Sequence, residues 1–284
     1  MEAYTDFAAV YDTFMDETPY AVWGTFVAGL IEKYGISKPV RSGDVQGKEL
    51  SEEYDTAEDS EQALNEEKNL IVELGCGTGS FTQELYKLGY DIMGIDLSPD
   101  RLNLARMKSA EAGYNIMYLE QDMRELDLYC TAGTIVSVCD SINYVLEDQE
   151  VIDTFKLVNN FLYPGGVFIF DFNTLHKYRD VIGDTTIAEN REDCSFIWDN
   201  YYHEEEHVNE YDLTIFARCD EKDEVFRRSV ETHFQRGYTL EEMRQFVEKA
   251  GLSFIEAIDA DTHKGPDDNS ERIYIIAREN GKRI

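Results

Sequence analysis

Basic residues are scarce in this chain. Its 284 residues contain 26 Lys and Arg against 58 Asp and Glu, so the net charge is −32 at pH 7. A surface with this balance repels the phosphates of nucleic acids and the headgroups of anionic lipids. The sequence also has no run of Lys and Arg that would form a local basic groove. We therefore expect neither a nucleic acid nor a membrane as a partner of this protein.

Long apolar runs and paired cysteines are missing as well. No apolar stretch approaches the ~20 residues that a membrane-spanning helix needs. The first four residues, MEAY, do not begin the basic and apolar segments of a secretory signal. The five cysteines are far apart and form no CxxC pair, which argues against a disulfide framework and against a zinc site. The sequence therefore predicts a cytoplasmic protein without a metal site.

The N-terminal part divides into two segments of different character. Residues 1–40 hold two helical patterns of apolar residues, one on each side of Pro19, and are expected to form helices. Residues 41–68 are rich in acidic side chains and poor in aliphatic ones. A segment of that composition offers too little apolar surface to pack as core. We expect 41–68 to be a flexible acidic linker.

Strands and helices alternate between residues 69 and 175. The expected strands are short and apolar throughout, which is typical of a parallel sheet that is covered on both faces. They lie at 69–74, 91–95, 116–119, 134–139 and 167–172. The helix after the second strand has a clear start, with Ser98 as the N-cap and Pro99 at its first position. The pattern predicts an α/β fold whose core includes 69–175.

The pattern changes in residues 176–237, which hold three longer segments that alternate apolar and polar side chains between charged turns. These segments lie at 196–202, 208–218 and 225–235. They predict a small antiparallel insertion after the fifth strand, placed to cover a substrate. A capping-box pattern at Thr239 and Glu242 starts a last helix, and 238–284 complete the core.

The strongest motif lies between the first strand and its helix. Residues 72–79 read VELGCGTG, so Gly75, Gly77 and Gly79 alternate with other residues. Glycines let a ligand approach the backbone closely, and the start of the next helix offers unpaired N–H groups. Dinucleotide enzymes have the spacing GxGxxG instead. The loop predicts a cofactor site, although a purely structural turn between a strand and a helix also uses glycine.

Two acidic residues follow at the ends of the next two strands. Asp96 ends the second expected strand, where a carboxylate can accept hydrogen bonds from both hydroxyls of a ribose. Asp122 follows the third strand, with Met123 beside it. Ligands of open α/β sheets bind along the edge where the strands end. Features at three successive strand ends therefore favour a cofactor site over a structural loop.

Together these residues resemble the class I S-adenosylmethionine methyltransferases. Residues 73–79 are similar to the first motif of that family, and Asp140 and the turn at 164–167 match two further segments. The resemblance implies a Rossmann-like methyltransferase fold with a mostly parallel seven-stranded sheet, helices on both faces, and S-adenosylmethionine as the cofactor. The cofactor-binding residues that it implies are Tyr11, Glu73, Gly75, Gly77, Gly79, Asp96, Leu97, Ser98, Asp122, Met123 and Asp140.

The resemblance also implies where each part of the cofactor lies. The glycine loop wraps the amino-acid end and Asp96 binds the ribose. Leu97 and Ser98 lie beside the adenine, whose amino group Asp122 contacts. Residues 1–40 are similar to the lid helices of small-molecule members, in which Tyr11 would close over the cofactor. For Tyr11, packing on an amphipathic helix is an equal alternative.

Methyl transfer needs positioning more than covalent chemistry, because the sulfonium carries its own leaving group. The protein must align the acceptor and exclude water, and it needs a general base only for an acceptor that is protonated. We place His233 and Tyr238, near the end of the third antiparallel strand, in the acceptor pocket as candidate catalytic residues. The alternative for His233 is a strand histidine paired with a neighbour.

The sequence leaves the acceptor and the oligomeric state open. The charge favours a small molecule such as an amine over RNA, and a basic protein that docks on 41–68 is a further alternative. An NAD(P)-dependent oxidoreductase would share the first strand–helix–strand unit, but the GxGxG spacing, Glu73 and Asp122 oppose it. A protein that binds S-adenosylmethionine without catalysis stays open, because no residue excludes it.

Overall fold

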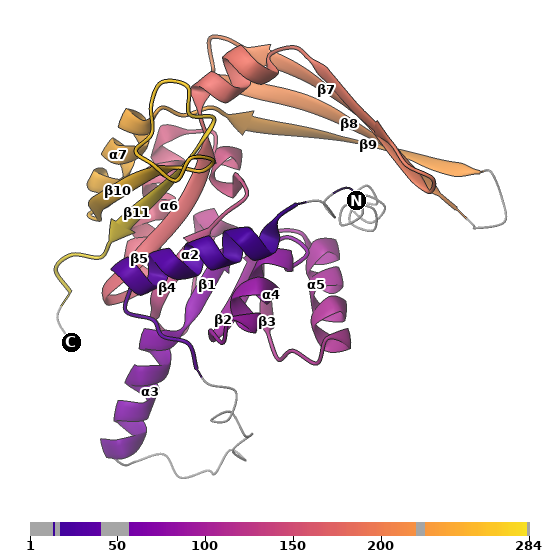
Figure 1. Cartoon of the computed structure of the whole chain (residues 1–284). Coiled ribbons are helices and arrows are strands. Elements are labelled where there is room, and N and C mark those ends of the chain that lie inside the picture. The colour runs from indigo at the N-terminus through magenta and orange to yellow at the C-terminus, as the bar shows by residue number, and fades with distance from the viewer. Residues whose placement is uncertain (1–13, 15–17, 41–56, 220–224, 283–284) are drawn as a thin grey trace.

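The computed structural model describes residues 14, 18–40, 57–219 and 225–282. Its core is a seven-stranded sheet. The strands are β1 (Ile71–Leu74), β2 (Ile92–Asp96), β3 (Met117–Glu120), β4 (Ala132–Ser137), β5 (Leu162–Asn173), β10 (Ser253–Asp259) and β11 (Arg272–Arg278). They lie in the order β10-β11-β5-β4-β1-β2-β3, and only the pairs that involve β11 are antiparallel. The expected Rossmann-like fold with a mostly parallel sheet is confirmed (Figure 1).

Helices cover both faces of this sheet, which explains why its inner strands carry apolar residues on both faces. One face packs against α2 (Tyr20–Tyr34) and α4 (Ser80–Lys87), with α5 (Pro99–Glu111) over β2 and β3. The other face packs against α6 (Asp148–Phe161) and α7 (Leu240–Lys249). Successive residues of β5 alternate between these two layers, Phe168 and Phe170 toward α6 and Val167 and Ile169 toward α2.

The predicted helix starts are present. The Ser98 hydroxyl accepts a hydrogen bond from the Arg101 N–H at 3.3 Å, and Pro99 is the first residue of α5. Thr239 and Glu242 form the reciprocal capping box of α7, with Thr239 Oγ1 accepting from the Glu242 N–H at 3.2 Å. Each contact supplies a partner to a backbone N–H that has none within its own helix.

The expectation for 41–68 needs a correction. Its second half forms a helix, α3 (Ala57–Asn69), while residues 41–56 lie outside the described part. The sequence of the helix has few apolar residues, yet hydrogen bonds with the core hold its last turn. Glu67 accepts a hydrogen bond from the Thr131 N–H at 3.2 Å, and the Lys68 carbonyl accepts one from the Ser37 hydroxyl at 3.1 Å. These contacts come from distant segments, which composition alone does not reveal.

The antiparallel insertion after β5 is confirmed as a separate four-stranded sheet. It consists of β6 (Thr186–Asn190), β7 (Cys194–His203), β8 (Val208–Arg218) and β9 (Phe226–Arg236), in that order. β6 and the short helix η3 (Lys177–Ile182) before it were not expected from the sequence. The chain leaves the core at Thr174 and returns at Tyr238, and these two residues pair with each other. From this point the long strands extend away from the core (Figure 1).

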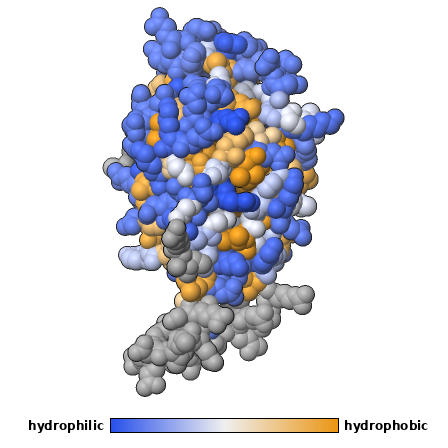
Figure 2. All heavy atoms as spheres, turned by 90° about the vertical axis from the view of Figure 1, so that its left-hand side faces the viewer, coloured by the Kyte–Doolittle hydropathy of each residue, from blue (hydrophilic) through white to orange (hydrophobic). Residues whose placement is uncertain are grey.

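The outer surface is largely polar on the side of the molecule that carries α7 and β10. Figure 2 shows that hydrophilic residues cover most of this face, with hydrophobic residues at its centre and in smaller patches toward its edges. Within the described ranges, no helix is both long enough and apolar enough to cross a membrane.

Candidate active site

A cavity of about 350 Å³ lies at the carboxyl edge of the parallel strands. The loop between β1 and α4 forms one wall, and the end of β4 with the turn after it forms another. Side chains of β7, β8 and β9 face these walls from the insertion, and Tyr20 and Trp23 of α2 contribute a further side. The cavity therefore lies where the core meets the insertion, at the sheet edge where α/β proteins bind their ligands.

The glycine loop shapes its wall through the backbone. Gly75, Gly77 and Gly79 have φ angles of 73°, 54° and 75°, which only glycine adopts readily. A Cβ on Gly75 would lie 2.4 Å from the Ser141 hydroxyl, so packing requires this glycine. A Cβ on Gly77 would meet no atom within 4 Å, and Gly77 lines the cavity. Gly77 therefore leaves space for a ligand directly against the main chain.

Asp96 lies next to the cavity, behind the backbone of Gly77. Its Oδ2 accepts a hydrogen bond from the Gly77 N–H at 2.7 Å, and its Oδ1 accepts one from the Ser98 N–H at 2.9 Å. The side chain is only 8% exposed. A carboxylate has lone pairs for about four hydrogen bonds, so each oxygen retains capacity for one more donor. The Asp96 carboxylate is thus oriented by the loop and able to accept further hydrogen bonds.

Glu73 is a buried carboxyl group in the cavity wall. It extends from β1 toward α4, where it accepts a hydrogen bond from the Thr82 hydroxyl. Burial raises the pKa of Glu73 from 4.5 to about 8, the Thr82 hydrogen bond opposes this rise, and the nearby Asp96 charge adds to it. Without a cationic ligand, Glu73 is therefore protonated at neutral pH. A positive charge in the cavity would favour its ionised form.

The titration of Glu73 predicts a measurable dependence of stability on pH. The unfolded chain loses this proton near pH 4.5 and the folded chain only near pH 8, so the folded state loses stability as the pH rises between these values. Between pH 6 and pH 8 the cofactor-free protein should lose about 2 kcal/mol of unfolding free energy relative to Glu73→Gln. Urea unfolding at both pH values measures this difference. Glu111→Gln, at an exposed site, is the control and should follow the wild type. Equal pH dependence in all three proteins would contradict the prediction.

The turn after β4 is strained and held by a second buried carboxylate. Cys139 and Asp140 have φ angles of 60° and 54°, which are uncommon for residues other than glycine. Asp171 of β5 accepts hydrogen bonds from both of their N–H groups, at 3.1 and 2.8 Å. Arg272 lies 3.7 Å from Asp171 and stacks over the Trp23 ring at 4.3 Å. This arrangement fixes Asp140 in the cavity wall, where burial raises the pKa of its carboxyl.

The insertion contributes a polar and aromatic wall. His233 of β9 lines the cavity and is 6% exposed, and its Nε2 lies 3.2 Å from Glu231 Oε2. The Tyr211 ring of β8 stacks on His233 with the ring centres 4.9 Å apart. The Tyr144 hydroxyl lies 2.8 Å from the Tyr211 hydroxyl and 3.5 Å from His233 Nδ1. His233 therefore lies in the cavity wall, where the sequence analysis placed it. It is also paired with a neighbour, Glu231, which was the alternative interpretation.

Three predicted cofactor residues lie along the same sheet edge but do not line the cavity. Leu97 is 64% exposed. Asp122 forms an ion pair with Arg124 at 2.7 Å, which lowers the pKa of its carboxyl. The Met123 methyl group lies close to Gly75, 3.5 Å from the position of a Cβ there. Their roles at an adenine remain predictions.

Two further predicted residues are used by the fold itself. Gly79 packs toward β3, because a Cβ on it would lie 2.6 Å from the Tyr118 hydroxyl. Ser98 caps α5 through its hydroxyl, and its N–H is bound by Asp96. Neither residue lines the cavity. Tyr11 lies outside the described residues.

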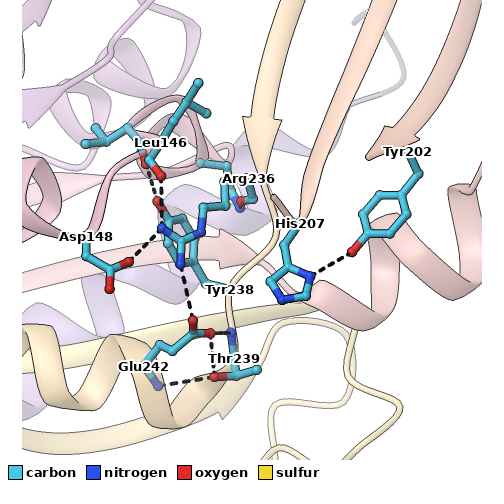
Figure 3. Close-up of polar contacts among 10 residues, drawn as sticks. Leu146, Asp148, Tyr202, His207, Arg236, Tyr238, Thr239 and Glu242 are labelled. Atoms are coloured by element: carbon cyan, nitrogen blue, oxygen red, sulfur yellow. Dashed lines mark hydrogen bonds and ion pairs between the residues drawn. The ribbon is translucent and has the colours of Figure 1, made fainter. Parts of the chain in front are cut away.

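The prediction that Tyr238 lies in the acceptor pocket is wrong. Tyr238 is fully buried in the core beside Phe246, and its hydroxyl donates to the Val145 carbonyl. The Arg236 guanidinium covers its ring at 4.7 Å and bonds Asp148 at 2.6 Å (Figure 3). An aromatic residue directly before a capping box packs against its helix, so Tyr238 anchors the junction of β9 and α7.

Several site residues were not identified from the sequence. Asp171 has a signal, because it is the one charged residue of the apolar strand that precedes the insertion. Gln235 has no such signal in the sequence. Its Nε2 donates to Asp140 Oδ2 at 2.6 Å and so joins β9 of the insertion to the turn after β4. Tyr144 likewise comes from a turn without a motif. These residues become visible only when the strands are paired.

The residues of the cavity fit S-adenosylmethionine. The expected cofactor is cationic, and the carboxyl groups of Glu73 and Asp140 lie in the wall together with the Trp23 ring. Gly77 provides the backbone surface, and Asp96 keeps lone pairs for hydroxyl donors beside it.

Comparisons with known proteins agree with this geometry. A family model described as "Methyltransferase domain" matches residues 71–166. A "Putative methyltransferase" of Geobacillus sp. (strain WCH70) is 30% identical over 275 residues, covering 97% of this chain and 99% of the relative. "Putative methyltransferase YqeM" of Bacillus subtilis (strain 168) is 30% identical over 277 residues, 97% of this chain and 96% of that protein.

A solved structure has the same fold along its whole length. The S-adenosylmethionine-dependent methyltransferase from Clostridium acetobutylicum ATCC 824 aligns with a TM-score of 0.77 at 23% identity, covering 99% of this chain and 100% of that one. The likeness extends over both the core and the insertion. The full-length relatives and the matching domain model show that this chain belongs to the class I S-adenosylmethionine-dependent methyltransferases, a family of enzymes.

Proposed function

We propose that the methyl acceptor is a small molecule with an amine group, bound between the cofactor edge and the inner face of β7, β8 and β9. The observation that carries this proposal is the cavity itself, which is walled by the glycine loop on one side and by the insertion on the other. A cavity of about 350 Å³ is large enough for a small molecule beside part of the cofactor.

The lining of the insertion side supports an amine. Phe196, Trp198 and Tyr211 offer aromatic faces, and Asp140 and Glu189 add carboxylates. Aromatic faces and carboxylates both attract ammonium groups and the cationic methyl group in flight. The net charge of −32 acts in the same direction, because it attracts cationic molecules.

We also propose how the cofactor is held. Asp96 accepts hydrogen bonds from the ribose hydroxyls, and the backbone at Gly75 and Gly77 lies against the amino-acid end. Leu97 and Met123 flank the adenine, and Asp122 binds its amino group. When bound, the cofactor supplies an electrophilic methyl group. The protein then has to align the acceptor and keep water out of the cavity.

One relative whose name states its acceptor gives further support. A Streptomyces venezuelae enzyme named as an N,N-dimethyltransferase of a dTDP-3-amino sugar is 26% identical over 126 residues, 44% of this chain and 52% of that protein. On the sequence arguments alone, we keep the cytoplasm as the predicted location and expect no nucleic acid as a partner.

The test combines a binding and an activity measurement. Calorimetry with S-adenosylhomocysteine should show saturable binding, with NAD⁺ as the control ligand. Methyl-labelled cofactor is then incubated with a panel of amino sugars and simple amines, beside phenols, carboxylates, RNA and a basic protein. Transfer to at least one amine is the expected result. Transfer only to RNA or to protein, or binding of NAD⁺ in place of S-adenosylhomocysteine, would contradict the proposal.

Trp198 offers a sharper test of where the acceptor lies. Its indole Nε1 is buried and has no hydrogen-bond partner within the described part of the chain, so an acceptor oxygen or nitrogen could accept from it. We expect Trp198→Phe to raise the KM for the acceptor about 5-fold, the effect of one neutral hydrogen bond. Tyr201→Phe, on the outer face of the same strand, should leave KM unchanged. Both variants should bind S-adenosylhomocysteine like the wild type, and a loss of that binding would place Trp198 at the cofactor instead.

A further inference from the structure

The inner side of β9 is polar where a buried strand face is normally apolar. Glu231, His233 and Gln235 are 5%, 6% and 3% exposed, whereas Phe234 between them is 43% exposed. Polar side chains are costly to bury, and an exposed phenylalanine gains little for the fold. This pattern is the reverse of the one that stability alone favours. It points to a function for the polar residues beside the cavity.

The hydrogen bonds among these residues have one consistent direction. The Glu231 carboxylate can only accept, so in a neutral His233 the proton lies on Nε2, which is 3.2 Å from Glu231 Oε2. Nδ1 is then an acceptor, and the Tyr144 hydroxyl lies 3.5 Å from it. Tyr144 in turn can accept from the Tyr211 hydroxyl at 2.8 Å, whose raised pKa keeps it protonated. The basic nitrogen of His233 therefore faces the Tyr144 hydroxyl in the cavity wall.

We propose that Glu231, His233 and Tyr144 form a proton relay that takes the proton released by the methyl acceptor. Glu231 is a positioning residue, since it does not line the cavity and acts by fixing the tautomer of His233. Tyr144 and His233 line the cavity and carry the proton. The inference rests on the proposed amine acceptor, because only an acceptor with a proton to lose needs a base.

In the proposed transfer, the lone pair of the acceptor nitrogen forms the bond to the methyl carbon, and the carbon–sulfur bond breaks with its electron pair remaining on sulfur. The proton on the nitrogen passes to the Tyr144 oxygen while the Tyr144 proton passes to His233 Nδ1. His233 becomes an imidazolium, and the Glu231 carboxylate beside Nε2 stabilises its charge. No other reactant is required.

The same sheet contains a matched pair that lacks access to the cavity. On its outer face, His203 Nε2 lies 2.7 Å from Glu210 Oε2, and both side chains are partly exposed. A histidine–carboxylate contact is thus present on both faces. Only the inner pair combines burial, a tyrosine on the second nitrogen and a place beside the cavity. The outer pair therefore serves as the control for the inner one.

The first arm of the test reads the histidine tautomer and needs no acceptor. In protein labelled with ¹⁵N-histidine, the ring nitrogens of His233 are assigned by their loss in His233→Asn. We expect the Nε2–H form to dominate in the wild type. Glu231→Gln should lower the ratio of Nε2–H to Nδ1–H forms about 5-fold or more, because a neutral amide replaces a charged acceptor. Glu231→Asp keeps a carboxylate and should restore the preference, and Glu210→Gln should affect only His203.

The second arm measures transfer to the most active amine of the panel. Glu231→Gln and Tyr144→Phe should each lower kcat about 10- to 100-fold with KM and S-adenosylhomocysteine affinity within about 3-fold of the wild type. Glu210→Gln should leave kcat unchanged. A wild-type tautomer ratio in Glu231→Gln, or a shifted ratio with unchanged kcat, would overturn the relay. If no amine is methylated, the proposed acceptor fails instead, and the tautomer arm then decides on the role of Glu231 alone.

Discussion

Asp96→Ala is expected to weaken binding of S-adenosylhomocysteine by about 100- to 1000-fold, because charged hydrogen bonds of about 1.5–3 kcal/mol each are lost. The substitution removes the acceptor for the Gly77 and Ser98 N–H groups. It also removes the carboxylate that, in our proposal, accepts hydrogen bonds from the ribose hydroxyls. The substitution therefore removes a hydrogen-bond partner of the glycine loop together with the proposed ribose ligand. Calorimetry gives the change in Kd directly.

Two measurements separate this loss from general damage. Asp153→Ala removes an exposed carboxylate on α6, 53% exposed and far from the glycine loop in sequence, and it should leave Kd unchanged. The melting temperature of Asp96→Ala shows whether the fold persists. A folded Asp96→Ala protein that binds S-adenosylhomocysteine within about 3-fold of the wild type would remove Asp96 from the site, since one charged hydrogen bond alone exceeds that factor.

The cofactor edge could be predicted from the sequence because its determinants are local. Positive φ angles at Gly75, Gly77 and Gly79 require glycine, so the turn leaves a pattern in a few consecutive residues. The ends of parallel strands always meet at one edge of the sheet, which brings Asp96 to this loop without any knowledge of packing. The helix caps at Ser98 and Thr239 are equally local. The fold class followed from these features and from the apolar strands.

The acceptor side could not be predicted in the same way, because its contacts join distant segments. Tyr144 and Tyr211 meet only after the insertion folds back over the turn that follows β4. The contact of Glu231 with His233 requires knowledge of which face of β9 is buried, and Phe234 suggests the opposite face. Tyr238 was misplaced for a related reason. Tyr238 is close in sequence to residues of the pocket, but this closeness does not show on which side of the chain its ring packs.

Gly133→Ala is expected to destabilise the fold by at least about 4 kcal/mol, which places it among the most damaging single substitutions. A Cβ on Gly133 would lie 1.7 Å from the Lys68 carbonyl oxygen and 2.5 Å from the Ser37 hydroxyl. The first of these is a backbone atom at the end of α3 and cannot move alone. The Ser37 hydroxyl is also held, by the Lys68 carbonyl at 3.1 Å and by Thr134 at 2.9 Å. One methyl group would therefore displace α3 and the segment at Ser37 from β4.

Gly29→Ala is the matched control, because it adds the same methyl group in open space. Gly29 lies within α2, and a Cβ there would meet no atom within 4 Å. Alanine is the better helix former, so this variant should gain about 0.5–1 kcal/mol. Urea unfolding of both variants beside the wild type should thus give changes of opposite sign. If Gly133→Ala unfolds at the wild-type urea concentration, α3 does not pack against β4 as described. Residues 57–68 would then fit the flexible acidic linker that their composition predicted.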